Sequence, residues 1–448
     1  MPSYSLLSLF SLDALTVAIA MLVSFLTIII GLYARRYLAG DSHYRQFYGL
    51  LVTLAASAIL MAASDHLLVF LLSWSISNTA LVLLITHKPQ WQAAANSGWL
   101  TAKTFLIGIT CLSSALLLLY LDTGQTSIKL ITAHIEPNQI LAMTAAACLI
   151  ITAMTQSAIW PFHRWLISSA NAPTPVSAIM HAGLVNGGGI LLAKFAPLFF
   201  SQPPLLLFIF IIGISTAITG SLWKLMQSDI KRMLACSTMA QMGFMFAQIG
   251  LGLFPAAIAH LCWHGLFKAN LFLQAYGVKQ DKFLESHHQI TSMEFILGLM
   301  IGMIGGYIFA VANQQPMLVN DTRLFLILIV IITASQFSIK LLEKPTLKII
   351  LLSLFFTTLA CATYGYSILL IESLLKPMNL MQPQSLNLFH AAAIILLVTA
   401  WLLMNFKSRV SCNEKIKNTG WMLYVKALNA SQPHPKTITT YRHQYKYH

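Results

Sequence analysis

Hydrophobic and polar positions alternate along this chain on the length scale of a lipid bilayer. Apolar stretches of about 17 to 24 residues are separated by shorter polar segments, and about 20 apolar residues make a helix that crosses a membrane. The pattern predicts an all-α integral membrane protein with about 13 transmembrane helices. The expected spans are residues 12–33, 47–63, 67–86, 99–121, 139–160, 175–195, 204–223, 231–250, 254–276, 293–312, 323–340, 348–371 and 386–406.

One apolar stretch carries titratable residues at a helical spacing. His260, His264 and Lys268 lie four residues apart, so on an α-helix they share one face, about 6 Å apart along the axis. Such groups are costly in an apolar helix unless they face a polar or hydrated interior, and imidazoles exchange protons near neutral pH. We call these three residues the His–His–Lys ladder. It indicates ion or proton movement, and the alternative is a buried polar network that fixes helix packing.

A second polar stretch, QSAIWPFHRWLISSANAPTPVSAIMHAGLVNGGG, connects the fifth and sixth spans. Pro161 is expected to bend or end the fifth span, because proline removes a helical hydrogen bond. His163 should then lie near the membrane interface, where its neighbours Arg164 and Trp165 also fit simple interfacial anchoring. Pro173 and Pro175 predict a rigid connector that leads back into the membrane.

Polar residues also mark the sixth and eighth spans. His181 and Asn186 are candidates for a functional polar axis, and the glycines around them permit close packing or local unwinding of the helix. Before the eighth span, Asp229 and Lys231 have two interpretations. They form either a helix start with an interfacial cation or, for Lys231, part of the axis itself.

Composition agrees with a membrane protein. Hydrophobic residues make up 57% of the chain and charged residues 9%, with a formal net charge of +14, whereas soluble domains are about 25% charged. The loops after odd-numbered spans, together with the span ends beside them, hold thirteen lysines and arginines, and the corresponding segments on the even-numbered side hold four. The positive-inside rule places the odd-numbered loops and residues 407–448 in the cytoplasm and the N-terminus outside. The basic charge is thus topological and does not indicate nucleic-acid binding. Alternatively, the tail binds anionic lipid or an acidic partner.

Motifs of soluble enzymes are absent from the sequence. Six cysteines are scattered without a CxxC pair, and there is no P-loop, GxGxxG, metal-ligand spacing or nucleophile–base motif. We expect no metal site, no cofactor and no enzymatic centre in this chain. The first apolar run lacks a basic n-region, so it is expected to be a retained helix and not a cleaved signal peptide.

Three long blocks stand out: PTPVSAIMHAG, DIKRMLACSTMAQMGFMF and HLCWHGLFKANLF. They resemble conserved blocks of the proton-translocating membrane subunits shared by respiratory complex I and Mrp-type cation antiporters, over roughly residues 12–280. Within that family, HAGLVNGGG and the run from STMAQMG to LFKA look most like the membrane subunit of the DAB (Mps) inorganic-carbon complex. The resemblance implies an antiporter-like fold of inverted five-helix repeats with broken helices.

The departures from the family pattern are informative. Trp74 is followed by Ser75 where complex I and Mrp subunits have a glutamate, and Gln156 stands at their central lysine. Span 293–312 lacks their GIPP…SKD helix, and the chain begins at what corresponds to the third family helix. These losses favour the DAB interpretation. The resemblance assigns the ion or proton pathway to His181, Lys231, His260, His264 and Lys268, and it retains His163. Together with the local patterns described above, it leaves structural or coupling roles to His163, Pro161, Pro173, Pro175, Asp229 and Asn186.

The resemblance also implies a function. The chain would use an H+ or Na+ gradient to drive a large peripheral partner, similar to a zinc carbonic anhydrase, that converts CO2 to bicarbonate or takes bicarbonate up at the bacterial inner membrane. The zinc would belong to that partner. The alternatives are a subunit similar to NADH–quinone oxidoreductase subunit L or an Mrp antiporter subunit, and a non-conducting membrane anchor.

The expected organisation has five parts. Residues 1–46 form a first span and a basic loop, and 47–200 and 201–345 form two antiporter-like halves, the second divergent at its end. Residues 346–406 are C-terminal spans, and 407–448 are a basic cytoplasmic tail.

Overall fold

Helices make up almost all regular structure in the computed structural model, which describes residues 9–133, 140–275, 290–317, 319–343, 345–406 and 414–438. Among these residues, ten helical segments are long and apolar enough to cross a membrane. Three more helices match predicted spans: the shorter apolar α6 and the 21-residue α12 and α13, which carry the polar residues of interest. All 13 predicted spans therefore correspond to helices, and the prediction of a multi-pass all-α membrane protein is confirmed.

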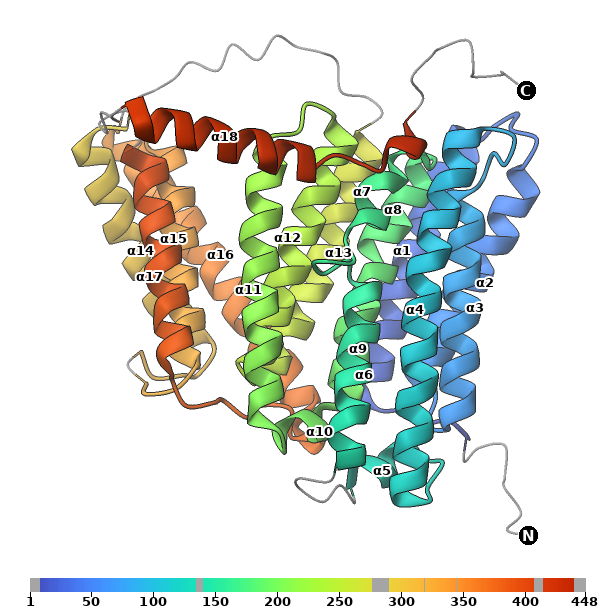
Figure 1. The fold of residues 1–448 in the computed structure, drawn as a ribbon. Coiled ribbons are helices and arrows are strands. Elements are labelled where there is room, and N and C mark those ends of the chain that lie inside the picture. Colours follow the sequence, from blue (N-terminus) through green and yellow to red (C-terminus); the bar gives the residue numbers. More distant parts are fainter. Residues whose placement is uncertain are drawn as a thin grey trace. The chain divides into compact units, whose positions relative to one another are not determined.

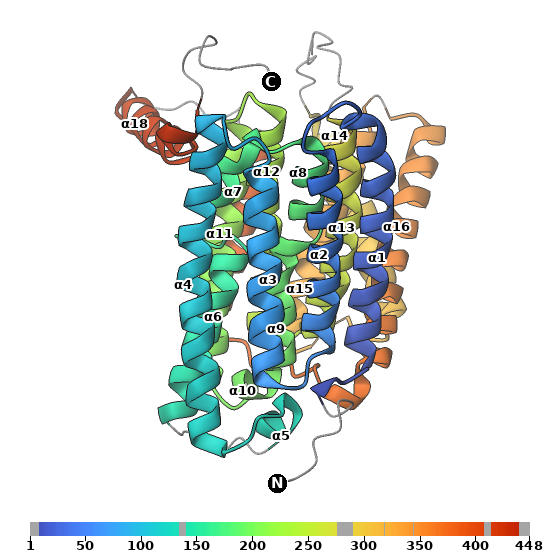
Figure 2. The ribbon, with the colours of Figure 1, turned by 90° about the vertical axis from the view of Figure 1, so that its right-hand side faces the viewer.

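The helices fall into two compact units. The first consists of Met1–Gly250, His260–Lys279 and Lys426–His448, and the second of Leu251–Ala259 and Gln280–Val425. The membrane-length helices of the first unit run side by side, and the short α5 and α10 lie at the end opposite α7 (Figures 1 and 2). Its helices are α1 (Ala14–Tyr37), α2 (Tyr44–Ala63), α3 (Leu67–Ile85), α4 (Gln92–Thr123), α5 (Ile128–Ala133), α6 (Ile140–Gln156), α7 (Arg164–Ser168), α8 (Thr174–Ala182), α9 (Gly187–Lys194), α10 (Ala196–Phe200), α11 (Pro203–Leu225), α12 (Ile230–Gly250) and most of α13 (Phe254–Gln274).

The second unit contains the predicted C-terminal spans. Its glycines allow close helix packing: a Cβ on Gly302 would lie 2.0 Å from the Ser335 hydroxyl. A polar contact also joins two of its helices, because the Trp401 indole Nε1 donates to Gln336 Oε1 at 2.7 Å. Its helices are α14 (Ser292–Ala312), α15 (Arg323–Leu341), α16 (Leu347–Leu374), α17 (Leu388–Phe406) and the first part of α18 (Glu414–Ala430).

Small residues bring α11 and α12 together in the first unit. A Cβ on Gly213 would lie 2.5 Å from the backbone nitrogen of Ala247, and one on Gly243 would lie 2.4 Å from that of Ala217. No side chain fits between these backbones, so the two helices are in direct contact, as is common for membrane helices with small residues at the interface. This contact fixes α12, which carries several of the candidate site residues.

The sixth span is broken in the middle. α8 ends at Ala182, a 3-10 turn (Leu184–Asn186) follows, and α9 begins at Gly187. Side chains near the end of α6 contact the interrupted turn: Ser157 Oγ donates to the Val185 carbonyl at 2.6 Å, and Gln156 Nε2 donates to the Leu184 carbonyl at 3.4 Å. The local unwinding that the glycines made possible is therefore present.

The fifth predicted span ends before Pro161, as this proline led us to expect. α6 stops at Gln156, so Pro161 lies in the loop before α7. The chain turns at Ala158, which has a φ of 52°. Pro173 precedes α8, and Pro175 lies in its first turn, where a missing backbone N–H costs nothing.

Candidate ion pathway in the first unit

The His–His–Lys ladder occupies one face of α13. The rings of His260 and His264 are stacked, with centroids 6.2 Å apart and planes inclined by 13°. His264 is 5% exposed and Lys268 is 1% exposed. The helical spacing therefore placed these side chains on a common face, as expected, and His264 and Lys268 are buried inside the protein.

A junction between three helices connects Lys268 with His181. Lys268 Nζ donates to the Leu234 carbonyl of α12 at 3.1 Å, and the Thr238 hydroxyl donates to the same carbonyl at 3.0 Å. The Thr238 oxygen also lies 3.1 Å from His181 Nδ1 on α8. The Leu234 carbonyl thus accepts from both side chains, and the Thr238 hydroxyl contacts His181, so these two groups hold the lysine and the histidine near each other.

Close packing of α13 against the broken helix makes this junction possible. A Cβ on Gly265 would lie 2.7 Å from the Ala182 carbonyl, so only glycine fits there. About two turns further along α13, the Phe272 ring stacks on the His181 imidazole, with centroids 4.3 Å apart. The stacked ring holds the imidazole on one side while Thr238 contacts its edge.

Several polar atoms along this line have no hydrogen-bond partner within the described part of the chain. They are His260 Nε2, both ring nitrogens of His264, and Asn186 Oδ1. Leaving a buried polar atom unpaired costs about 1–3 kcal/mol. Buried polar groups that protein atoms do not satisfy are typical of hydrated or ion-handling sites in membrane proteins.

Lys231 lies at the start of α12 and contacts residues 168–173, which lead into α8 and which we call the connector. Its Nζ donates to the Ala172 carbonyl at 2.8 Å and to the Ala170 carbonyl at 3.5 Å. Asp229 takes the helix-capping role that was one of its two interpretations, because its Oδ1 accepts from the Arg232 backbone N–H at 2.9 Å. Lys231 is therefore hydrogen-bonded to the connector, and its Nζ makes no direct hydrogen bond to His260, His264 or Lys268.

His163 lies apart from the ladder. It is 6% exposed, and its ring packs against Trp223 with centroids 4.9 Å apart. Burial, with a smaller contribution from the neighbouring charge of Arg164, lowers the pKa of His163 to about 4. The side chain is therefore neutral at physiological pH and packs as part of the core beside the connector.

The predicted polar tail contains structure. Residues 407–413 and 439–448 lie outside the described part, but α18 and a 3-10 turn (Pro435–Thr437) lie between them. Residues 431–437, which we call the C-terminal strap, bind the connector: Asn171 Nδ2 donates to the Thr437 carbonyl at 2.7 Å, and the His434 backbone N–H donates to Ser168 Oγ at 3.0 Å. Gln227 Nε2 donates to Ser431 Oγ at 2.8 Å. The strap thus holds the segment whose carbonyls bind Lys231.

Sequence reasoning missed Thr238, Phe272 and Asn171. Thr238 lies seven residues after Lys231, so helical spacing alone places both on one face of α12. Phe272 likewise follows Lys268 by four residues. Asn171 offered no such pattern, because its partners lie in α4 and in the strap.

Family models match most of the chain. The model described as NADH:quinone oxidoreductase/Mrp antiporter, TM matches residues 64–344, and the model for the N-terminus of complex I chain 5 matches residues 2–48. All candidate pathway and coupling residues, from Pro161 to Lys268, lie within the first of these ranges.

Curated relatives belong to two groups. The chain is similar to the probable inorganic carbon transporter subunit DabB of Bacillus subtilis (40% identical over 307 residues, 66% of this chain and 60% of the relative) and to DabB2 of Halothiobacillus neapolitanus (32% over 364 residues, 76% and 63%). It is also similar to NADH-quinone oxidoreductase subunit L of Escherichia coli (33% over 286 residues, 62% and 46%). The matched region spans about half to two thirds of these relatives' length.

A solved structure shares the fold. The Mrp complex from Dietzia sp. DQ12-45-1b superposes with a TM-score of 0.56 at 24% identity, covering 95% of this chain and 45% of that chain. This similarity confirms the antiporter-like fold that was expected.

Proposed function

Because this chain belongs to the NADH:quinone oxidoreductase/Mrp antiporter transmembrane family, we propose that it is the membrane subunit of an energy-coupled inorganic-carbon transporter. The observation that carries the proposal is its similarity to four inorganic carbon transporter subunits of Bacillus and Halothiobacillus, at 32–40% identity. The retained ladder, together with Gln156 and Ser75 in place of the charged residues of complex I and Mrp subunits, supports it.

In this proposal, H+ or Na+ moves along His260, His264, Lys268 and His181, and the Leu234 carbonyl and the Thr238 hydroxyl hold the last two side chains in place. Lys231 transmits the resulting change to the connector, because its Nζ is hydrogen-bonded there. A rearrangement of the connector then acts on a partner at the cytoplasmic face. The protein lies in a bacterial inner membrane, with its N-terminus outside and residues 407–448 in the cytoplasm.

The proposed partner is a large peripheral protein similar to a zinc carbonic anhydrase. Hydration of CO2 to bicarbonate, or bicarbonate uptake, takes place with that protein, which also supplies the zinc. Within the described residues of this chain, no three His, Cys, Asp or Glu side chains gather as metal ligands. In this proposal the chain acts as a coupling subunit, and the catalytic chemistry belongs to the partner.

The second candidate function is that of a respiratory or antiporter subunit. The similarity to subunit L of Escherichia coli and the Mrp-like fold favour it. The neutral Gln156 and Ser75 oppose it, since a charged pair at these positions characterises those subunits.

Affinity purification of the full chain from its native membranes, in mild detergent, tests the assignment. We expect a large zinc-containing soluble-type partner to co-purify, as determined by metal analysis and protein identification. Recovery of iron–sulfur and quinone-binding subunits, or of a set of antiporter subunits, would contradict the proposal and support the second candidate.

Two substitutions test coupling. His264→Ala and Lys268→Ala should each abolish carbon accumulation while the complex still assembles, and an uncoupler should have the same effect on the unmodified protein. A non-conducting anchor would be indifferent to all three treatments. Lys103→Ala, at an exposed position of α4, is the matched control.

A further inference from the structure

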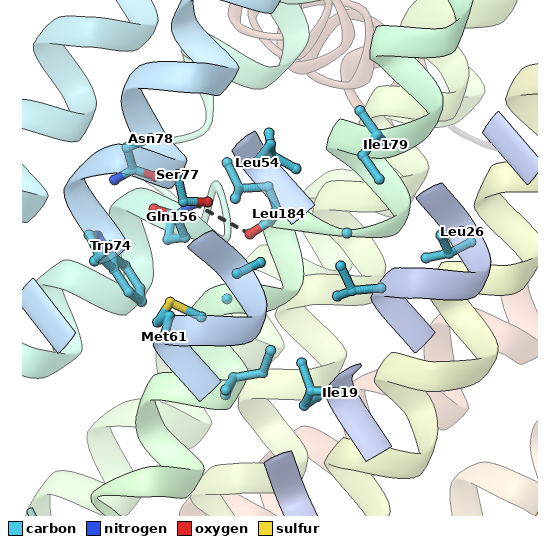
Figure 3. Close-up of a pocket in the computed structure, with 15 residues that line it drawn as sticks. Ile19, Leu26, Leu54, Met61, Trp74, Ser77, Asn78, Gln156, Ile179 and Leu184 are labelled. Atoms are coloured by element: carbon cyan, nitrogen blue, oxygen red, sulfur yellow. Dashed lines mark hydrogen bonds between the residues drawn. The ribbon is translucent and has the colours of Figure 1, made fainter. Parts of the chain in front are cut away.

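A cavity lies beside the broken helix. Residues of α1, α2, α3, α6 and the α8–α9 span line it, and the space open to the centres of water-sized molecules is about 30 Å³. By this measure one buried water needs about 10–15 Å³. The cavity therefore has room for one triatomic molecule or about two waters (Figure 3).

Three residues of α3 that line this cavity each carry a buried polar atom without a hydrogen-bond partner among the described residues. These atoms are Trp74 Nε1, Ser77 Oγ and Asn78 Nδ2, and the three residues are 2–3% exposed. Figure 3 shows Ser77 and Asn78 next to Gln156, across the cavity from the aliphatic side chains of Leu26 and Ile179. Burying hydrogen-bonding groups without partners is unfavourable, so an occupant that satisfies them stabilises the folded chain.

The chemistry of the lining defines this occupant. None of the described residues that line the cavity is acidic or basic, so neither a cation nor an anion would be compensated for the loss of its hydration. The indole N–H can only donate, the amide nitrogen donates, and the hydroxyl does both. The remaining lining is mostly aliphatic. These groups fit a small uncharged molecule that accepts hydrogen bonds through oxygen.

We propose that this cavity binds a small uncharged oxygen acceptor, which is carbon dioxide or water. The carbon dioxide alternative rests on the proposed function, which brings this molecule to the protein. The position of the cavity gives occupancy a consequence. Gly183, Leu184 and Gly187 line it, and Ala182, at the end of α8, lies against Gly265 of α13. Binding in the cavity and movement along the ladder therefore act on one interrupted segment of the chain.

Infrared spectroscopy of the full chain in detergent, equilibrated with ¹³C-labelled CO2, tests the proposal without a partner protein or a gradient. Bound CO2 gives an antisymmetric-stretch band separate from that of the dissolved gas. Ala58→Leu fills the cavity from α2, whereas Ala56→Leu adds the same volume on the exposed side of that helix. We expect the band in the wild type and in Ala56→Leu, and its loss in Ala58→Leu.

A second pair of variants guards against misfolding. Asn78→Leu removes the amide donor while it keeps the number and branching of the side-chain heavy atoms, and it should weaken CO2 binding about tenfold, as the loss of one hydrogen bond would. Thr79→Val, at an exposed neighbouring position, should leave binding unchanged.

A high-resolution density map of the protein, with and without CO2, separates the two occupants. Density in the cavity that does not respond to CO2, without the infrared band, identifies water. No density and no band, or density that depends on Na+, would overturn the proposal. Because binding is measured on the chain alone, bound CO2 in a protein that shows no carbon transport would refute only the proposed function. Transport by a protein whose cavity is unoccupied would refute only this inference.

Discussion

Lys268→Met separates a functional lysine from a structural one. Lys268 is 1% exposed and donates to one backbone carbonyl, with no acidic partner among the described residues. A lysine at the centre of a membrane helix costs about 2.5–3.5 kcal/mol. A hydrogen bond from a charged group returns about 1.5–3 kcal/mol. Methionine fills similar volume without either effect, so the free energy of unfolding should rise by about 1 kcal/mol.

The same substitution should stop gradient-driven transport. A residue that lowers stability while it is needed for activity is typical of functional sites. The assay pairs the thermal unfolding midpoint of the purified chain in detergent with cation flux and carbon accumulation. Lys103→Met, on the exposed face of α4 where the ammonium lies 5.2 Å from the Trp99 ring centroid, is the control and should change stability by less than about 0.5 kcal/mol.

Two results would refute this reasoning. If Lys268→Met lowers the midpoint by several degrees, the lysine is a packing element of a structural polar network. If the variant keeps full transport, the ladder does not carry the ion. A raised midpoint with lost transport is the outcome that the geometry at Leu234 supports.

Three further predictions follow from the contacts of the first unit. Thr238→Val should slow transport about tenfold, because it removes the hydroxyl that joins His181 to the Leu234 carbonyl. Thr238→Ser should retain most of the rate. Equal rates in the wild type and both variants would argue against a bridging role of this hydroxyl. Asn171→Ala should increase hydrogen exchange in the connector before α8 by about tenfold, as measured by mass spectrometry. Asn96→Ala is the control, because its amide contacts the strap at Lys436 and not the connector, and it should change this exchange less. Burial lowers the pKa of His87 below its ordinary value of 6.5, although its Nε2 lies 3.3 Å from Asp41 Oδ1 and this carboxylate favours the charged imidazole. As the pH falls, the unfolded chain therefore binds the proton first. The stability that is present above about pH 6.5 is then lost. His87→Gln should therefore flatten the fall in unfolding midpoint between about pH 7.5 and about pH 5.5, and an unchanged slope would exclude His87 as its source.

Local rules account for the parts of this protein that the sequence determined. Apolar stretches of bilayer length must form helices, since backbone groups in lipid have no other partners, and all predicted spans are helical. The four-residue spacing of His260, His264 and Lys268 placed them on one face because the helical repeat is set by the backbone alone. Glycines around Gly183 and the proline at position 161 likewise marked the broken span and the end of α6.

Tertiary packing decided the rest. The hydroxyl of Thr238 joins His181 to the carbonyl that also binds Lys268 only because α8, α12 and α13 meet there. Thr238 lies 57 positions from His181 in the chain, and Leu234 lies 34 positions from Lys268. Asn171 binds a strap 266 residues away, and the cavity beside Trp74 collects side chains from separate helices. Helical periodicity fixes the face on which a side chain lies, but not which helix that face meets. That depends on how small residues such as Gly265 and Gly243 allow backbones to approach, which is a property of the folded chain.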